Sequence, residues 1–370
     1  MRFEYLDNAE LSRIEDILWP VYADPQIQGV MMLMASDTAP NINALDKLLI
    51  DAPKPIFGGI FPALIWQAEM INKGVIFIFF DCPLDIMVLP DLKTNLENIE
   101  HGFLAPVHSS TDYRATMFTF VDGVSEYTGA LISSLFNQFG LEFNYIGGGC
   151  GHADFRRAPC VITPQGVLES AAVVGLVHSS SRVGVAHGWT PISPAFKVTG
   201  IDGNSIVTLD WQPAFTVYQQ VVEAHAQQPL TAQNFSQLAK AYPFGIANLG
   251  DEMVVRDPVR EQDGRLRCVG AIRQGAYVHV LHGDPQSLLA AARRANEKAR
   301  ALPRERESQC QILVDCVSRA LFLGPRFAEE LAVIQTPGLP MLGALTIGEI
   351  ANSGQDYLEF FNKTAVVGLL

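Results

Sequence analysis

The stretch Val30-Met-Met-Leu-Met34 has the length and apolarity of a buried strand, and a helix-forming segment leads from it to Phe57-Gly58-Gly59-Ile60. The same order returns near the C-terminus. There, Ile312-Leu-Val-Asp-Cys316 leads through a helix to Leu342-Gly343-Ala344-Leu345. Single apolar runs recur by chance, but their shared order indicates a duplicated α/β unit.

A further pair of segments extends this internal repeat. Asn72-Lys-Gly-Val-Ile76 follows the first copy, and Asn362-Lys-Thr-Ala-Val366 follows the second. Two copies of such a unit would pack as pseudo-symmetric halves. We therefore predict an α/β (α+β) fold, with mixed β-sheets in a shared core and helices outside. Its specific form would be a four-layer α-β-β-α sandwich.

The remaining patterns suggest how the chain is divided. Leu11, Ile14 and Leu18 lie at helical spacing, which predicts an N-terminal helix over residues 1–27. Residues 84–115 combine proline, histidine and mixed charge, which indicates a long loop or a strand with a loop. The two larger regions are expected to span residues 28–225 and 226–370.

Composition excludes several classes of function. With 26 basic and 39 acidic residues the formal net charge is −13, which disfavours nucleic acid as a partner. The apolar run from Gly74 to Phe80 is far too short to span a membrane, and the first residues carry acids where a signal peptide needs apolar ones. The six cysteines include no C-x-x-C pair. A cytoplasmic protein with reduced thiols is expected.

The motifs for the commonest enzyme chemistries are absent. The cluster Gly147-Gly148-Gly149-Cys150-Gly151 lacks the Lys-Ser/Thr of a P-loop, so it indicates close backbone approach to a strand or a ligand instead. There is no Gly-x-Ser-x-Gly elbow and no zinc-site spacing. We expect neither catalytic residues nor a metal site, and hence a protein that is not an enzyme.

Two places carry candidate binding residues. His187 lies between an apolar strand and Gly188-Trp189; it could ligate a haem iron or simply pack and bond a carbonyl. Cys316 and Arg319 lie where a strand gives way to a helix. Arg319 could clamp a carboxylate ligand or pair with Glu349 as a structural ion pair, and Cys316 could be a reactive thiol.

Together these segments resemble the FIST domain family, sensory modules with paired N- and C-terminal FIST regions. The resemblance covers roughly residues 28 to 370. It rests on Ile56-Phe-Gly-Gly-Ile-Phe-Pro62, Val183-Gly-Val-Ala-His187-Gly-Trp189, Phe196-Lys-Val-Thr199, Asp210-Trp-Gln-Pro213-Ala214, Val314-Asp-Cys316-Val-Ser-Arg319, Leu342-Gly-Ala-Leu-Thr-Ile-Gly-Glu-Ile350 and Phe361-Asn-Lys-Thr364.

The resemblance implies a ligand-sensing signal-transduction protein. No output domain is recognised in the sequence, so a partner such as a sensor histidine kinase would carry the signal. The chain is similar in length to haem-binding nitric-oxide sensors of the family, which implies haem b as a cofactor, with His187 as the candidate ligand.

The alternative is a haem-free receptor for a small polar metabolite such as an amino acid. Arg319 and Glu349 would then grip its carboxylate and amine, with Cys316 and Asn362 in the same ligand site.

Overall fold

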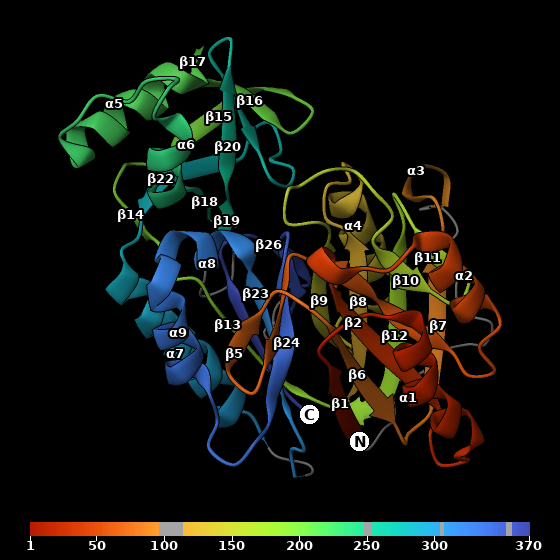
Figure 1. Cartoon of the computed structure of the whole chain (residues 1–370). Helices are drawn as coiled ribbons and strands as arrows, with labels where there is room; N and C mark the ends of the chain where they lie inside the picture. Colours follow the sequence, from red (N-terminus) through yellow and green to blue (C-terminus); the bar gives the residue numbers. More distant parts are fainter. Residues whose placement is uncertain (96–113, 248–252, 304–306, 353–356) are drawn as a thin grey trace.

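The computed structural model describes residues 1–95, 114–247, 253–303, 307–352 and 357–370. Three six-stranded sheets form the body of the molecule, and a fourth, nine-stranded sheet forms a separate lobe. Helices lie on the outside of the body, and the lobe projects from one end of it (Figure 1). The predicted mixed α+β class with outer helices is confirmed.

The first sheet has the order β1-β6-β2-β3-β10-β11. We divide the body into three modules, each a stretch of chain that supplies most strands of one sheet. The first module contains β1 (Arg2–Leu6), α1 (Leu11–Ala23), β2 (Gly29–Ala35), α2 (Ile42–Ile50), β3 (Ile56–Phe61), β4 (Ala63–Trp66), β5 (Glu69–Ile71) and β6 (Val75–Phe80). The predicted N-terminal helix is α1, with Ile14 and Leu18 buried. The residues before it were predicted wrongly as helix, because Arg2–Leu6 pairs with β6 as an edge strand.

The second sheet has the order β26-β25-β9-β8-β12-β7. The second module contains β7 (Leu84–Leu89), α3 (Leu92–Asn95), β8 (Ala115–Asp122), α4 (Thr128–Phe139), β9 (Asn144–Cys150), β10 (Val161–Thr163), β11 (Gly166–Leu168) and β12 (Ala172–Ser180). Of the segment expected to be mainly loop, the beginning forms β7 and α3, and residues 96–113 lie outside the described part.

The third sheet has the order β13-β27-β23-β24-β4-β5. The third module contains β13 (Arg182–Ala186), α7 (Pro285–Ala301), β23 (Gln311–Cys316), α8 (Val317–Leu323), α9 (Phe327–Ile334), β24 (Met341–Thr346), β25 (Glu349–Ala351), β26 (Glu359–Phe361) and β27 (Ala365–Leu369).

The three sheets are built on one plan. In each, two parallel strands are joined through helix, as β2–β3, β8–β9 and β23–β24, and an antiparallel strand pairs with the first of them. Each module also sends a hairpin onto another sheet: β4–β5 joins the third, β10–β11 the first, and β25–β26 the second. The predicted repeat is therefore correct, but it has three copies, and the sequence comparison missed the middle one.

Three sheets rather than two surround the shared core, which corrects the four-layer version of the fold. Phe57 of the first sheet, Phe118 of the second and Val314 of the third belong to one buried cluster. The adjacent Leu313 points the other way, toward the helices that cover the third sheet. Successive side chains of these strands thus enter apolar layers on opposite faces of the sheet, and both faces are buried, as the almost wholly apolar strand sequences require.

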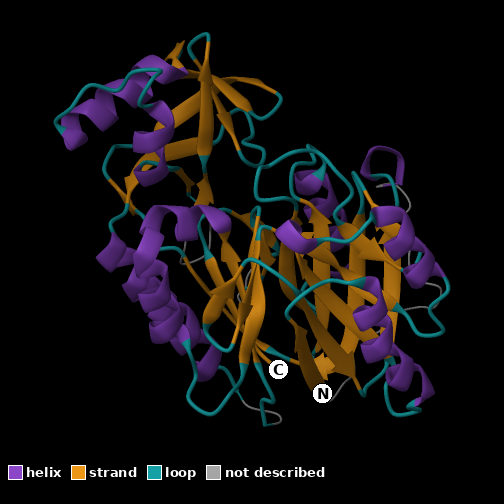
Figure 2. Ribbon diagram, viewed as in Figure 1, coloured by secondary structure: helices purple, strands orange, loops and turns teal. Residues whose placement is uncertain are grey.

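The lobe is an insertion between β13 and α7, formed by residues 190–247 and 253–282 (Figure 2). It contains β14 (Thr190–Pro191), β15 (Phe196–Asp202), β16 (Ser205–Leu209), β17 (Gln212–Pro213), α5 (Ala214–Ala226), α6 (Phe235–Leu238), β18 (Phe244–Ile246), β19 (Val254–Arg256), β20 (Pro258–Gln262), β21 (Arg265–Cys268) and β22 (Tyr277–His282). It has its own apolar cluster, in which the tilted rings of Tyr218 and Phe244 have their centres 5.3 Å apart.

Candidate functional site

Arg319 lies on α8 with its side chain completely buried. Its guanidinium donates two parallel hydrogen bonds of 2.9 Å to the Glu330 carboxylate, and its Nε lies 3.2 Å from Asp315. The remaining donors reach backbone carbonyls, those of His187, Lys363 and Leu288. All the directions in which Arg319 could bind a carboxylate ligand are therefore occupied by the protein.

Asp315 completes this buried ion cluster. Burial and the neighbouring Glu330 carboxylate raise the pKa of Asp315 well above its usual range, and Arg319 only partly offsets them. A second buried negative charge next to Glu330 would be costly, so Asp315 keeps its proton. One cation then faces one anion, and the cluster ties α8 and α9 to β23.

Glu349 and Cys316 lie close together beside the ends of β24 and β23. Glu349 accepts hydrogen bonds from the Thr346 hydroxyl at 3.0 Å and the Thr364 N–H at 3.2 Å. Burial raises the pKa of Glu349 to about 8. Burial, and then the Glu349 carboxyl, raise the pKa of the Cys316 thiol far above neutrality. Cys316 is therefore a thiol at neutral pH, not the thiolate that nucleophilic chemistry needs.

The buried Glu349 carboxyl predicts a measurable pH dependence. Above about pH 4.5 the unfolded chain loses a proton that folded Glu349 keeps up to about pH 8. The folded state binds more protons in this window, so stability falls as the pH rises, by about 1.4 kcal/mol per pH unit from this group. Urea unfolding from pH 5 to 8 should show that Glu349→Gln removes this share of the slope.

Glu329→Gln is the matched control for that experiment. Glu329 is exposed on α9, and its hydrogen bond to Arg326 lowers its pKa, so it titrates below the window. Its replacement should leave the slope between pH 5 and 8 unchanged. Equal slopes in wild type and Glu349→Gln would mean that Glu349 titrates normally in the folded protein.

His187 follows β13 and is 4 % exposed. Its Nδ1 accepts a hydrogen bond from the Trp189 N–H at 2.9 Å, and its carbonyl oxygen accepts one from Arg319 at 2.6 Å. The next residue, Gly188, lies against α7, where a Cβ atom would come within 2.6 Å of the Ser287 carbonyl oxygen. His187 is thus packed between β13, α7 and the Arg319 cluster.

A pocket of about 480 Å³ lies where the lobe meets the second and third modules, and we call it the seam pocket. The body supplies residues from the turn after β8, from the loop after β9, and from the ends of β23 and β24. The lobe supplies residues from β16 to β21. The side chains used below are Glu126, Phe155, Arg157, Asp257, Arg260, Arg267, Cys268, Cys316, Ser318 and Asn362.

The floor of the seam pocket is polar and largely buried. Asp257, between β19 and β20, is 6 % exposed and accepts a 2.9 Å hydrogen bond from the Ser318 hydroxyl. Its backbone N–H donates to the Asn362 side-chain oxygen at 3.3 Å. The amide of Asn362 also donates to the Phe361 carbonyl. These contacts hold polar oxygen and nitrogen atoms at the bottom of a pocket that opens to solvent.

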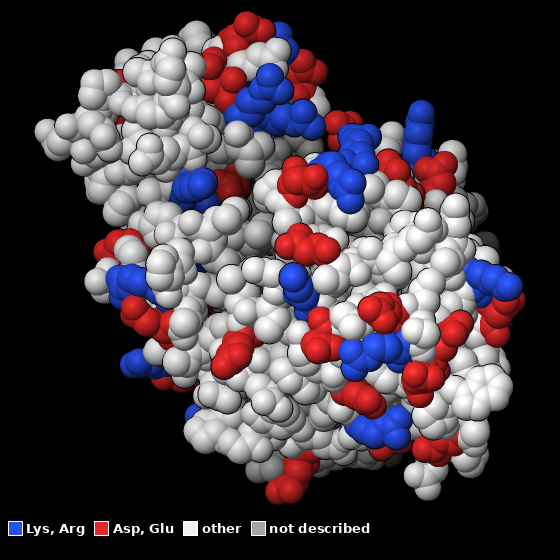
Figure 3. All heavy atoms as spheres, in the orientation of Figure 1, with Lys and Arg blue, Asp and Glu red and all other residues white. Residues whose placement is uncertain are grey.

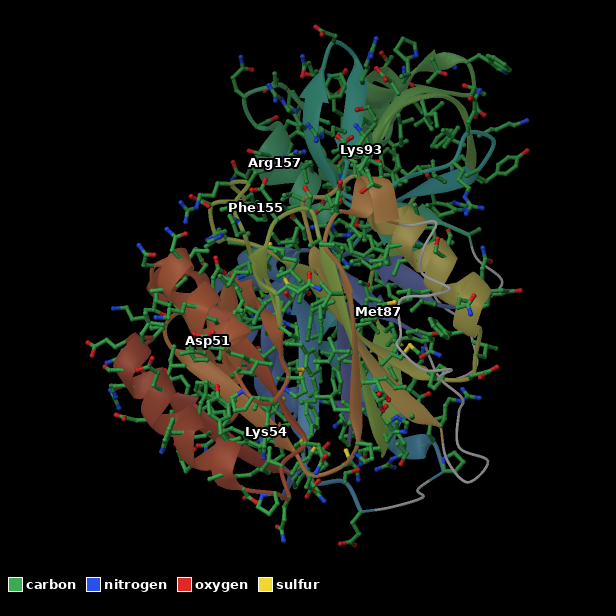
Figure 4. All side chains as sticks on the ribbon, turned by 90° about the vertical axis from the view of Figure 1, so that its right-hand side faces the viewer. Asp51, Lys54, Met87, Lys93, Phe155 and Arg157 are labelled. Atoms are coloured by element: carbon green, nitrogen blue, oxygen red, sulfur yellow. The ribbon has the colours of Figure 1, made fainter. Side chains whose placement is uncertain are left out.

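The rim is charged and partly apolar. Arg157 and Phe155 lie on the loop after β9, just below the strands of the lobe (Figure 4). Arg267 on β21 faces Glu126 at 3.9 Å, across the boundary between lobe and body. Basic and acidic side chains gather side by side where the lobe approaches the body (Figure 3). The pocket therefore offers cations, anions and an exposed aromatic ring to one small molecule.

Of the predicted ligand-binding residues, Cys316 and Asn362 line the seam pocket, whereas Arg319 and Glu349 are not among its lining residues. His187, predicted separately as a haem ligand, is not among them either. The sequence analysis missed Asp257, Ser318 and the rim arginines. Arg260 and Arg267 follow each other closely in the β20–β21 hairpin, whose sequence looks like an ordinary exposed turn, and Arg157 lies on an irregular loop, so no local signal marked them.

The fold and the pocket define the class of protein. It consists of repeated α+β modules, and a pocket lined by both acidic and basic side chains lies between the lobe and the body. Residues 30–212 match the FIST N domain, and residues 214–352 match the FIST C domain. The chain belongs to the FIST family, whose domains are sensors of signal transduction. A comparison with curated proteins finds no match. Within the described residues, no helix has both the length and the apolarity to cross a membrane.

Proposed function

We propose that this protein is a receptor for a small zwitterion, of the amino-acid class, that binds in the seam pocket. The observation that supports this is the lining of the pocket, in which arginines and carboxylates lie around one space of about 480 Å³. That volume lies within the range of about 300–1,000 Å³ that is typical of small-molecule sites.

Each group of lining residues has a role in this proposal. The guanidinium groups of Arg260 and Arg267 suit a ligand carboxylate, since arginine binds carboxylates through paired hydrogen bonds. The Glu126 carboxylate suits the ligand ammonium, since Asp257 is already paired with Lys363, and the Asn362 amide adds a polar contact at the floor of the pocket. Phe155, 47 % exposed at the rim, would contact the side chain of the ligand.

The position of the pocket fits a sensing role. Glu126 and Arg157 belong to the FIST N match, while Asp257 and Ser318 belong to the FIST C match. A ligand that contacts both would favour the arrangement in which the two regions are held together. A signalling partner would respond to this change in the arrangement of the two regions. A sensor histidine kinase stays our prediction for that partner, as does a cytoplasmic location.

The alternative, a haem-based nitric-oxide sensor, is less well supported by the surroundings of His187. A haem ligand needs a flat slot beside its free nitrogen. The ring of His187 is buried, and Gly188 is pressed against α7. These residues do not fit a haem group, and we assign no step to one. A Soret band in protein purified from haem-supplemented cells, shifted by nitric oxide, would favour haem over the zwitterion.

The receptor is tested by thermal-shift measurements with the twenty proteinogenic amino acids, followed by calorimetry on any that stabilise the protein. Arg260→Ala should weaken binding at least tenfold, about 1.4 kcal/mol. Arg265→Ala is the matched control: it lies in the same hairpin, but its partner is Asp202, and it does not line the pocket.

Binding that is weakened by Arg260→Ala and retained by Arg265→Ala would support the site. Equal losses in both variants would place the ligand elsewhere. If no amino acid shifts the melting temperature, the proposed ligand class is wrong.

A further inference from the structure

The two covalent connections between lobe and body lie side by side. The chain enters the lobe at Thr190 and leaves it at His282, and these two residues pair directly in the β14–β22 ladder. The Thr190 hydroxyl also donates to the His282 carbonyl oxygen at 3.3 Å. An insertion connected in this way can rotate about that point once its other contacts with the body open. These contacts include the hydrogen bond from Arg256 to the Phe360 carbonyl oxygen and the packing of β19 against the body.

Lys363 makes a buried polar contact between the body and the lobe. Its side chain is completely buried, and its Nζ lies 3.1 Å from Asp257 and donates to the Lys240 carbonyl oxygen at 3.0 Å. Both partners belong to the lobe. The ammonium also lies 5.1 Å from the centre of the Trp189 ring, at the point where the lobe begins. A buried ammonium is stable only while such partners surround it.

The internal repeat provides a comparison within the same chain. Register places Asn72-Lys73 of the first module where Asn362-Lys363 stands in the third, because Ile76 pairs with Leu33 as Val366 pairs with Val314. Lys73 is exposed, and Lys363 is buried. The difference is the lobe, which covers only the third module. Lys363 would be hydrated like Lys73 if the lobe moved away.

We propose that the lobe is a hinged cover of the seam pocket, held shut by the contact of Lys363 with Asp257 and stabilised further in the closed position by a bound ligand. Asp257 also accepts a hydrogen bond from the Ser318 hydroxyl, so two side chains of the body bind one carboxylate of the lobe. This inference rests on the proposed function for the ligand. A molecule that contacts both the lobe and the body binds the closed form better and therefore shifts the protein toward it.

Native cysteines report the position of the lobe. Cys268 and Cys316 line the seam pocket and are each 3 % exposed, whereas Cys310 is buried elsewhere in the body core. Iodoacetamide labelling of the ligand-free protein, followed by peptide mass spectrometry, gives a rate for each thiol. Lys363→Met should raise the rates at Cys268 and Cys316 at least tenfold and leave Cys310 unchanged. Lys73→Met should change none of them.

Asp257→Asn provides a second variant that weakens the same contact from the lobe side, and it should raise the same two rates. Unchanged labelling rates at Cys268 in both variants would overturn the proposal that the lobe is a cover. A parallel rise in the labelling rate of Cys310 would also overturn it, because that rise reports global unfolding. Adding the amino acid that stabilises the protein most should slow labelling at Cys268. If no amino acid binds, the proposed function is wrong. The labelling rates of the ligand-free variants still decide whether the lobe is a cover.

Discussion

Replacing Arg319 with alanine should lower the free energy of unfolding by about 3–5 kcal/mol. The guanidinium is completely buried, holds both oxygens of Glu330 and donates to carbonyls from α7, from the turn before β27 and from the segment after β13. Its removal leaves the Glu330 carboxylate buried without a counter-charge and several carbonyls without donors. Urea unfolding followed by circular dichroism measures the loss.

A double variant separates charge from packing. Arg319→Met with Glu330→Leu removes both ions and keeps most of the side-chain volume, and Asp315 already carries its proton. We expect this pair to cost clearly less than Arg319→Ala alone, because no charge is left unpaired. If the double variant costs as much, the ion pair is not the reason for the instability. If Arg319→Ala keeps wild-type stability and loses ligand instead, Arg319 is a binding residue after all.

Gly343→Ala should destabilise the protein by about 3 kcal/mol. Gly343 on β24 pairs with Leu313 on β23, and a Cβ atom added there would lie 1.8 Å from the Leu313 carbonyl oxygen. The obstacle is backbone within a parallel ladder, so no side chain can move aside. The strands themselves must separate, and the core on both faces of the third sheet is then disturbed. Chemical denaturation checks the size of the effect.

Gly129→Ala is the control for this substitution. Gly129 lies on α4, where an added Cβ has only ordinary contact with Ala271 at 3.9 Å. A glycine inside a helix costs about 1 kcal/mol relative to alanine, so this variant should be more stable than wild type. Wild-type stability in Gly343→Ala would contradict the close approach of β23 and β24.

The same close approach occurs in the other two modules. Gly58 pairs with Met32, and Gly147 pairs with Thr119, each with less than 2 Å between an added Cβ and the facing carbonyl oxygen. The glycine cluster that resembles a phosphate loop is explained in this way: Gly147 is needed for strand packing. The sequence pointed to close backbone approach there, but not to the strand that approaches.

The sequence by itself determined the local elements and the repeat. The apolar strands and the similarity of residues 30–76 to residues 312–366 follow from side-chain periodicity, which acts over a few residues. The FIST family was also visible from short motifs and is confirmed by the matches to both of its domains.

Only the tertiary structure decided where those residues meet. Arg319 and Asn362 look like similar candidates in sequence, but one is enclosed by Glu330 and backbone carbonyls while the other lines the seam pocket. The pocket arginines Arg157, Arg260 and Arg267 come from a loop and a hairpin that carry no motif of their own. Burial and charge pairing arise between segments more than a hundred residues apart, such as Asp257 and Lys363, and no local pattern encodes them.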